Sequence, residues 1–147
     1  MRLTLPTDSN ERKEYPMYRG LLAYFPAALA GVARHSKQGN DKHNPGEELH
    51  HARGKSMDHE DCIVRHLVDL GDLRRRLDEN SEHDQADRLR LAVLDEANAL
   101  AWRALALSQE LHELLGAPLA PAAKLPQGPV AKGDDGGQLS LPLWVNC

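Results

Sequence analysis

His43–Asp69 reads HNPGEELHHARGKSMDHEDCIVRHLVD, a polar loop that runs into the start of a helix. Helical spacing of apolar residues predicts that this helix extends from about Asp58 to Leu70 with one apolar face. The face consists of Ile63, Val64, Leu67, Val68 and Leu70. Glu60 lies near its middle, with Asp61 and His59 at its two borders. A carboxylate in an apolar face is costly unless it is paired or binds a cation, so a metal site that serves phosphate chemistry is the first hypothesis.

The loop before this helix, residues 40–57, lacks periodicity and is rich in polar residues, Gly and Pro. A loop of this length in a compact domain is usually functional or disordered, and its polar side chains favour a functional loop. Histidines gather here and in the segments beside it: His35, His43, His50, His51, His59 and His66. Any one of them is most simply a polar surface residue, but surface polarity explains the cluster with its interleaved acids less well.

Three helices are expected. A turn over 17–25 precedes a first helix from Pro26 to about Lys37, which Gly39 and Asn40 should end, because proline suits a first helical turn. The second helix, capped by Ser56 or Asp58, should stop at Gly71. The charged segment 72–85 fits either a helical extension or a solvated loop. The third helix should run from about Ala86 to Leu115 and end at Gly116 and Pro118.

The third helix has two different faces. One is an apolar stripe of leucines and Val93, and the other carries Leu91, Asp95, Asn98 and Trp102. Two faces of different character suggest that both are covered, and with three helices a second subunit is the simplest cover. An all-α bundle completed by oligomerisation is therefore expected.

Bulk composition narrows the function. The chain has 147 residues and a net charge of −4, which allows one domain and argues against a general nucleic-acid binder. We expect no signal peptide and no membrane span, because no apolar run is long enough. Cys62 and Cys147 are far apart, so we expect a cytoplasmic chain without a disulfide framework.

The acids suit a hard divalent cation such as Mg²⁺, which takes oxygen ligands and substrate phosphates. The second helix offers Glu60 and Asp61, and the third offers Asp95 and Asn98 on one face. The competing interpretation is that Glu60 pairs with Arg103 or His66. The loop residues Arg53 and Lys55 could hold phosphate oxygens, and Asn44 could meet a base or sugar. Trp102 is explained more simply by packing than by base stacking.

At these residues the chain resembles a known family. The segments YRGLLAYFPAALAGVARHSKQGN, HNPGEELHHARGKSMDHEDCIVRHLVDLG and ANALAWRALAL are similar to the phage dATP/dGTP diphosphohydrolases. These are MazG-like all-α enzymes, and they include the MazZ group of phages whose DNA carries 2-aminoadenine in place of adenine. The resemblance covers roughly residues 15–110.

The resemblance implies hydrolysis of a purine nucleoside triphosphate, dGTP or GTP by preference, to the monophosphate and pyrophosphate. In a phage, within the host cytoplasm, the dGMP would supply synthesis of the 2-aminoadenine nucleotide. It further implies a homo-oligomer, with a tetramer favoured and a dimer possible, and two or three Mg²⁺ or Mn²⁺ ions per site. The residues themselves do not indicate a preference for dGTP over dATP, or for deoxyribonucleotides over ribonucleotides.

The chain departs from the general MazG pattern of Glu-x-x-Glu followed by Glu-x-x-Asp. Its nearest counterparts are Asp58-x-x-Asp61 or His66-x-x-Asp69, followed by Asp95-x-x-Asn98, and Glu60 matches neither spacing. The metal ligands are ranked as Glu60, Asp61 and Asp95, then Asn98 and Asp69. Glu60 or Asp61 would also orient or deprotonate the attacking water. The candidate substrate-binding residues are Asn44, Arg53, Lys55, His59 and Trp102.

The chain is expected to divide into a flexible N-terminus (1–14), a MazG-like domain (15–116), a linker (117–137) and a C-terminal peptide (138–147). In that peptide Gln138, Leu139, Leu141 and Leu143 resemble a hexapeptide that binds the bacterial sliding clamp. A flexible linker would let this peptide reach a host clamp. The alternative is that the apolar end folds back onto the domain or onto another subunit.

Two other functions compete. An HD-type phosphohydrolase would use the pair His83–Asp84 for metal, but it leaves the Glu60 region unexplained. A non-enzymatic adaptor would occupy a sliding clamp through residues 138–143 and need no metal. A nucleotide sensor without turnover is a weaker variant, which metal-dependent pyrophosphate release would exclude.

Overall fold

The computed structural model describes residues 3–80 and 83–126. Its elements are α1 (Ser9–Lys13), the π-helical turn η1 (Tyr18–Leu22), α2 (Pro26–His43), β1 (His51–Ala52), α3 (His59–Glu79), α4 (His83–Leu114) and β2 (Ala123–Lys124). The chain is therefore mostly helical, as the sequence predicts, with one pair of two-residue strands added. None of the helices in these residues combines the length and apolar character needed to cross a bilayer.

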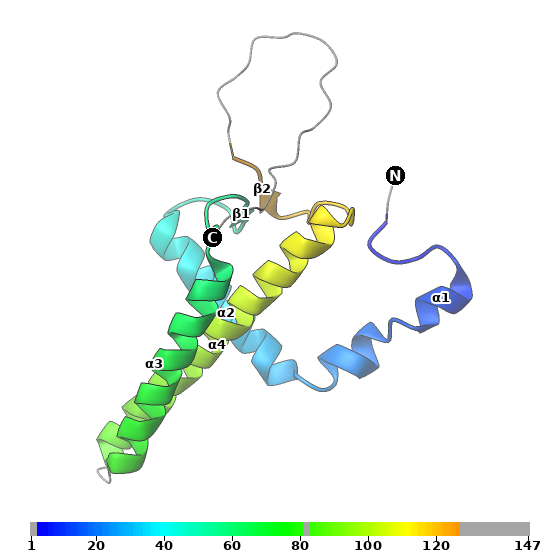
Figure 1. Ribbon diagram of the computed structural model, residues 1–147. Helices are drawn as coiled ribbons and strands as arrows, with labels where there is room; N and C mark the ends of the chain where they lie inside the picture. Colours follow the sequence, from blue (N-terminus) through cyan, green and yellow to red (C-terminus); the bar gives the residue numbers. More distant parts are fainter. Residues whose placement is uncertain (1–2, 81–82, 127–147) are drawn as a thin grey trace.

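Helices α3 and α4 lie antiparallel and pack along their length, and α2 crosses α4 (Figure 1). The pairing of α3 with α4 fixes their register: His66 Nδ1 lies 2.8 Å from Glu96 Oε2, and His59 Nε2 lies 3.3 Å from Glu110 Oε1. The start of α3 therefore lies beside the end of α4. The two strands close the same end of the pair (Figure 1).

Two helix ends differ from the sequence predictions. Helix α2 continues past Gly39 to His43, and α3 continues past Gly71 to Glu79. Glycine inside a helix costs only about 1 kcal/mol relative to alanine, which tertiary packing readily offsets. The packing of α3 against α4 thus extends a helix that local signals would have ended, and most of the charged segment 72–85 is helical.

Other local signals are confirmed. Pro26 occupies the first turn of α2, and α4 ends at Leu114 just before Gly116, which adopts a φ of +95°. Asp58 takes the N-cap position of α3, but its carboxylate makes no capping bond; it pairs instead with Arg65 at 2.7 Å.

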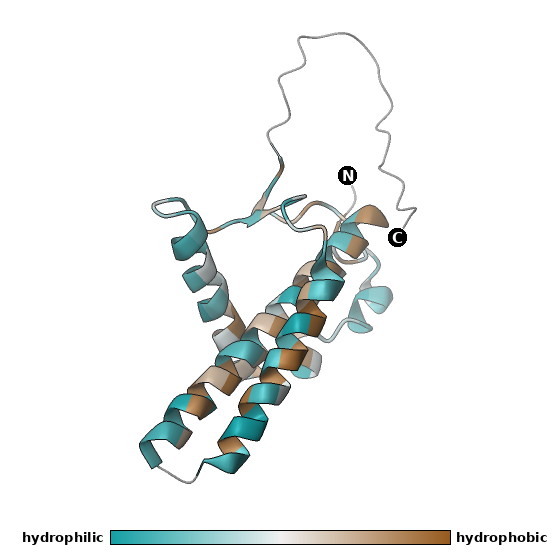
Figure 2. Ribbon diagram, turned by 60° about the vertical axis from the view of Figure 1, so that its left-hand side comes forward, coloured by the Kyte–Doolittle hydropathy of each residue, from teal (hydrophilic) through white to brown (hydrophobic). Residues whose placement is uncertain are grey.

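The core is thin and made of small side chains. In the described residues the buried apolar side chains are Val32, Ala86, Ala99 and Ala106. Val64, Leu67 and Val68 of the predicted apolar face of α3 are 57%, 55% and 58% exposed. Figure 2 shows apolar residues on outward-facing parts of α3 and α4 as well as where the two helices meet. One chain therefore leaves much of its apolar surface in contact with water.

Helices α2 and α4 approach closely at Gly31. A Cβ atom at this position would lie 2.7 Å from Oδ1 and 3.1 Å from Cγ of Asn98, a buried residue of α4. Glycine is therefore required by close approach, and Asn98 serves as a packing residue against α2.

We expect Gly31→Ala to lower the free energy of unfolding by about 1–3 kcal/mol, because the added methyl group displaces the buried Asn98 amide. Urea denaturation followed by circular dichroism measures the change.

Gly39→Ala on the same helix is the matched control, since a Cβ atom there meets nothing within 4 Å. That substitution should be neutral or stabilise by up to about 1 kcal/mol. Equal effects of the two substitutions would contradict the close contact between α2 and α4.

Candidate functional site

The short parallel pair β1–β2 builds the site. His51 pairs with Ala123 and Ala52 with Lys124, through bonds from His51 N to Ala122 O (2.9 Å) and from Arg53 N to Lys124 O (2.8 Å). Residues 117–126 open the segment that the sequence predicts as a linker. They return along the 44–55 loop and form one wall of the site.

An ion pair anchors this loop to α4. Arg53 Nε and Nη2 donate to the two carboxylate oxygens of Glu113, each at 2.8 Å, and both side chains are largely buried. Gln109 and the backbone N–H of Ala120 also donate to Glu113. The bond from Arg53 is the main reason that the pKa of Glu113 falls to about 2 from its ordinary 4.5. The carboxylate is therefore ionised at any physiological pH.

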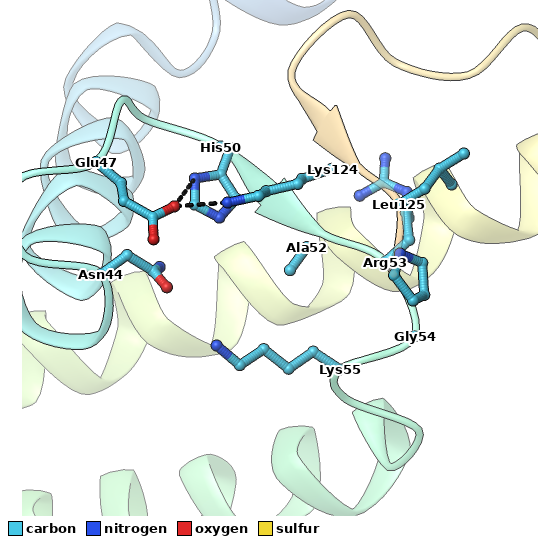
Figure 3. A pocket seen from close by; sticks show the side chains of 10 residues that line it. Asn44, Glu47, His50, Ala52, Arg53, Gly54, Lys55, Lys124 and Leu125 are labelled. Atoms are coloured by element: carbon cyan, nitrogen blue, oxygen red, sulfur yellow. Dashed lines mark hydrogen bonds and ion pairs between the residues drawn. The ribbon is translucent and has the colours of Figure 1, made fainter. Parts of the chain in front are cut away.

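A pocket opens on one side of β1 (Figure 3). Its volume is about 430 Å³, within the range of small-molecule sites. It is lined by Asn44, Glu47, His50, Ala52, Arg53, Gly54, Lys55, Lys124, Leu125 and Pro126. Gly54 adopts a φ of +70°, which favours glycine, and makes the turn that leads to Lys55.

The charges of the pocket are unequally compensated. Glu113 neutralises Arg53, and Glu47 Oε2 holds Lys124 Nζ at 2.6 Å. In the described part of the chain the Lys55 ammonium makes no hydrogen bond or ion pair, and its side chain extends across the pocket toward Asn44 (Figure 3). Lys55 is therefore the cation best placed to receive an anion.

Side chains alternate along β1, so His51 points away from the pocket and toward α4, and the guanidinium of Arg53, a residue that also lines the pocket, turns to Glu113. There His51 Nε2 lies 3.6 Å from Glu110 Oε1, and the same oxygen lies 3.3 Å from His59 Nε2. Within residues 3–80 and 83–126, these three side chains are the one group of three or more that could hold a metal ion, with ligand atoms within 4.8 Å of one another.

Aromatic and cationic neighbours enclose His51. The Trp102 ring meets it edge-on with centroids 5.0 Å apart, and Arg103 stacks over that indole while donating to Ser56. Burial, and next the positive charge of Arg53, lower the pKa of His51. Its imidazole is therefore neutral at neutral pH.

The predicted metal ligands fall at two levels of the α3–α4 pair. Glu60 and Asp61 are exposed in the first turn of α3, at the level of Glu110. Asp95 is exposed on α4, fifteen residues before Glu110 and therefore about 22 Å along the helix axis. One chain does not gather these acids around one ion.

The remaining candidate metal ligands, Asp69 and Asn98, lie away from the Glu110 end of the helix pair, toward the level of Asp95. Asp69 is exposed on α3, eight residues or about 12 Å beyond Asp61, and Asn98 packs against Gly31. Asp95 lies near His35. Burial is the main reason that the pKa of His35 is lowered, and the negative charge of Asp95 opposes that shift. Glu60 forms no ion pair with Arg103 or His66; His66 pairs with Glu96.

The substrate-binding candidates gather more closely. Asn44, Arg53 and Lys55 all contribute to the pocket, although the Arg53 guanidinium is turned to Glu113. His59 and Trp102 lie on the opposite side of β1, around His51. The pair His83–Asp84 is exposed in the first turn of α4, and Gln138, Leu139, Leu141 and Leu143 lie outside the described residues.

Sequence reasoning did not single out Glu110, Glu113 or Lys124. The two glutamates are three residues apart on α4, a spacing that places both on one helical face and could have drawn attention to them. Lys124 offered no local signal, because its place depends on the pairing of β2 with β1.

Comparison of the chain with models of known protein families, with curated protein sequences and with solved structures gives no match.

We expect Glu113→Gln to lower the free energy of unfolding by about 3 kcal/mol at pH 7, because it leaves the buried Arg53 charge without a partner. Because folding lowers the pKa of Glu113 to about 2, its stabilising contribution is full above about pH 4.5 and fades as the pH falls toward 2. Urea denaturation of both chains from pH 7 to pH 2 measures this difference.

Glu79→Gln, at the exposed end of α3, is the control and should follow the wild-type profile at every pH. A constant gap between wild type and Glu113→Gln from pH 7 to pH 2 would show that the ion pair does not act as described.

Proposed function

We propose that this protein hydrolyses a purine nucleoside triphosphate, preferably dGTP or GTP, to the monophosphate and pyrophosphate. The observation that carries the proposal is the pocket beside β1, to which three residues chosen from sequence as nucleotide ligands contribute: Asn44, Arg53 and Lys55. The family resemblance over residues 15–110 supplies the reaction. In a phage with 2-aminoadenine DNA, the dGMP product would feed synthesis of the modified nucleotide.

In this proposal the pocket residues have separate tasks. Lys55, which makes no hydrogen bond or ion pair with the described residues, binds phosphate oxygens and stabilises the charge that develops on them. Asn44 offers an amide to the base or sugar. Arg53 acts through Glu113, by holding the loop that carries Lys55 against α4. The residues thereby orient the triphosphate, which is the main task of an enzyme in phosphoryl chemistry.

Reactions of this kind commonly depend on a divalent ion. The acids ranked first from sequence, Glu60, Asp61 and Asp95, do not gather within one chain. We therefore assign no step of the reaction to them, and Mg²⁺ or Mn²⁺ at those residues stays a prediction.

We expect the protein to release pyrophosphate from dGTP when Mg²⁺ or Mn²⁺ is present. Addition of EDTA should abolish this release. Lys55→Ala should lower kcat/KM about 10- to 100-fold, because a charge-assisted bond to phosphate contributes about 1.5–3 kcal/mol. Pyrophosphate release from each of the eight common NTPs and dNTPs measures both the activity and its preference.

Lys13→Ala removes the same charge from α1 and should leave kcat/KM unchanged. Glu60→Gln in the same assay tests the sequence-derived ligand: loss of release supports Glu60, and full release shows that the metal binds elsewhere. No release from any nucleotide would overturn the proposed hydrolysis.

We also propose that the chain acts as a homo-oligomer, a tetramer in preference to a dimer. The exposed apolar residues of α3 and α4 support this proposal, since a large apolar surface rimmed by charge is typical of an interface. A shallow apolar hollow of about 270 Å³ lies between the two helices and adds to that surface. It is lined by Ile63, Ala104, Leu107, Ser108, Leu111, His112 and Leu115.

Leu67→Lys should shift the protein to a smaller assembly, because a charge buried in an apolar interface is strongly unfavourable. Light scattering coupled to size-exclusion chromatography measures the mass. Asp78→Lys, at an exposed position of the same helix, should leave the mass unchanged. A wild-type chain that elutes as a monomer would refute the oligomer.

A further inference from the structure

His59 is a buried histidine without a hydrogen bond. The residue is 4% exposed, and neither Nδ1 nor Nε2 has a hydrogen-bonding partner in the described residues. Buried polar atoms are nearly always satisfied, so an orphaned imidazole requires a physical explanation. The contact that it does make, from Nε2 to Glu110 Oε1 at 3.3 Å, lacks the geometry of a hydrogen bond.

The distances around this histidine match those between ligands of one ion. Two ligands about 2.0 Å from a tetrahedral zinc ion lie about 3.3 Å apart. Glu110 Oε1 lies 3.3 Å from His59 Nε2 and 3.6 Å from His51 Nε2. Each imidazole thus stands close to ligand separation from the Glu110 carboxylate, and all three ligand atoms lie within 4.8 Å of one another.

We propose that His51, His59 and Glu110 bind one divalent transition-metal ion of the Zn²⁺ class. The proposal does not rest on the hydrolysis proposed above, because metal binding is measured directly. Two imidazoles and one carboxylate form a familiar three-ligand set, with the fourth position left to water or another group. His51 and Glu110 each keep about a quarter of the side chain exposed, which gives that position access to solvent.

The charges of the site favour a cation. The Glu110 carboxylate faces the imidazoles of His51 and His59, and the positive Arg53 is already paired with Glu113. The excess negative charge of Glu110 is therefore available to an ion. Imidazole ligands favour zinc and its neighbours over Mg²⁺, which prefers oxygen.

Arg53 determines how His51 must adjust. Arg53 Nη1 contacts His51 Nδ1, and because a guanidinium only donates, the imidazole proton lies on Nε2 in the metal-free chain. Metal binding at Nε2 moves that proton to Nδ1, with no net release. Two donors then face each other, and because Glu113 holds the rigid guanidinium in place, the His51 ring must shift away from Arg53 Nη1.

The ion would lie on the opposite side of β1 from the nucleotide pocket. It joins three segments that meet only in the folded chain: β1 through His51, the first residue of α3 through His59, and the end of α4 through Glu110. Its effect is to hold the pocket loop in place, so metal uptake should raise the thermal stability of the chain.

The test uses the full chain stripped of metal with a chelator. Isothermal titration should show that each chain binds one Zn²⁺ ion and that it binds Mg²⁺ far more weakly. Thermal unfolding should show a higher Tm with Zn²⁺ than without it. Glu110→Gln and His59→Gln should each weaken Zn²⁺ binding by more than about 100-fold, because even outer partners of a ligand contribute 10- to 100-fold. Circular dichroism verifies that both variants keep their helices.

His66→Gln is the matched control, because His66 forms a His–Glu pair with Glu96 on the same two helices. It should bind Zn²⁺ as wild type does. A wild-type chain that takes up no Zn²⁺, or a folded Glu110→Gln chain that binds it as tightly as wild type, overturns the proposal. Pyrophosphate release is assayed separately, so loss of hydrolysis with intact Zn²⁺ binding argues against the proposed function alone.

Discussion

The buried ion pair between Arg53 and Glu113 links the irregular part of the chain to the helical part. It joins the residue after β1 to the end of α4 through two bonds of 2.8 Å, and Ala120 donates to the same carboxylate. Breaking such a pair leaves an uncompensated charge, which costs far more than the pair contributes at a surface. It therefore ties both the loop before α3 and the segment after α4 to the same glutamate of α4.

From that anchor, the alternation of side chains along β1 divides the site into two sides. His50 and Ala52 face the pocket that Lys55 and Lys124 border, while His51 faces Glu110 and His59. The side proposed to bind phosphate and the side proposed to bind a metal ion thus share one short strand. Any change that moves β1 should therefore affect both sides together.

The helical framework was largely predictable, because its signals are local. Pro26 and Gly116 mark helix ends that the structure confirms, whereas Gly71 does not end its helix, since packing of α3 on α4 outweighs the cost of one glycine. Periodicity places Glu60 in the apolar face of α3, where a carboxylate would need a partner or a cation, but much of that face is exposed in one chain, and Glu60 with it. Periodicity identifies a face without showing what covers it.

The sequence by itself determined the helical class and singled out three residues that line one pocket, because residue type and spacing carry that information. Only the tertiary structure decided that Glu110 meets His51 and His59, and that Lys124 joins the pocket. These contacts link residues some fifty to eighty positions apart. Their physical cause is the register of α3 on α4 together with the pairing of β1 and β2, and neither leaves a local pattern in the chain.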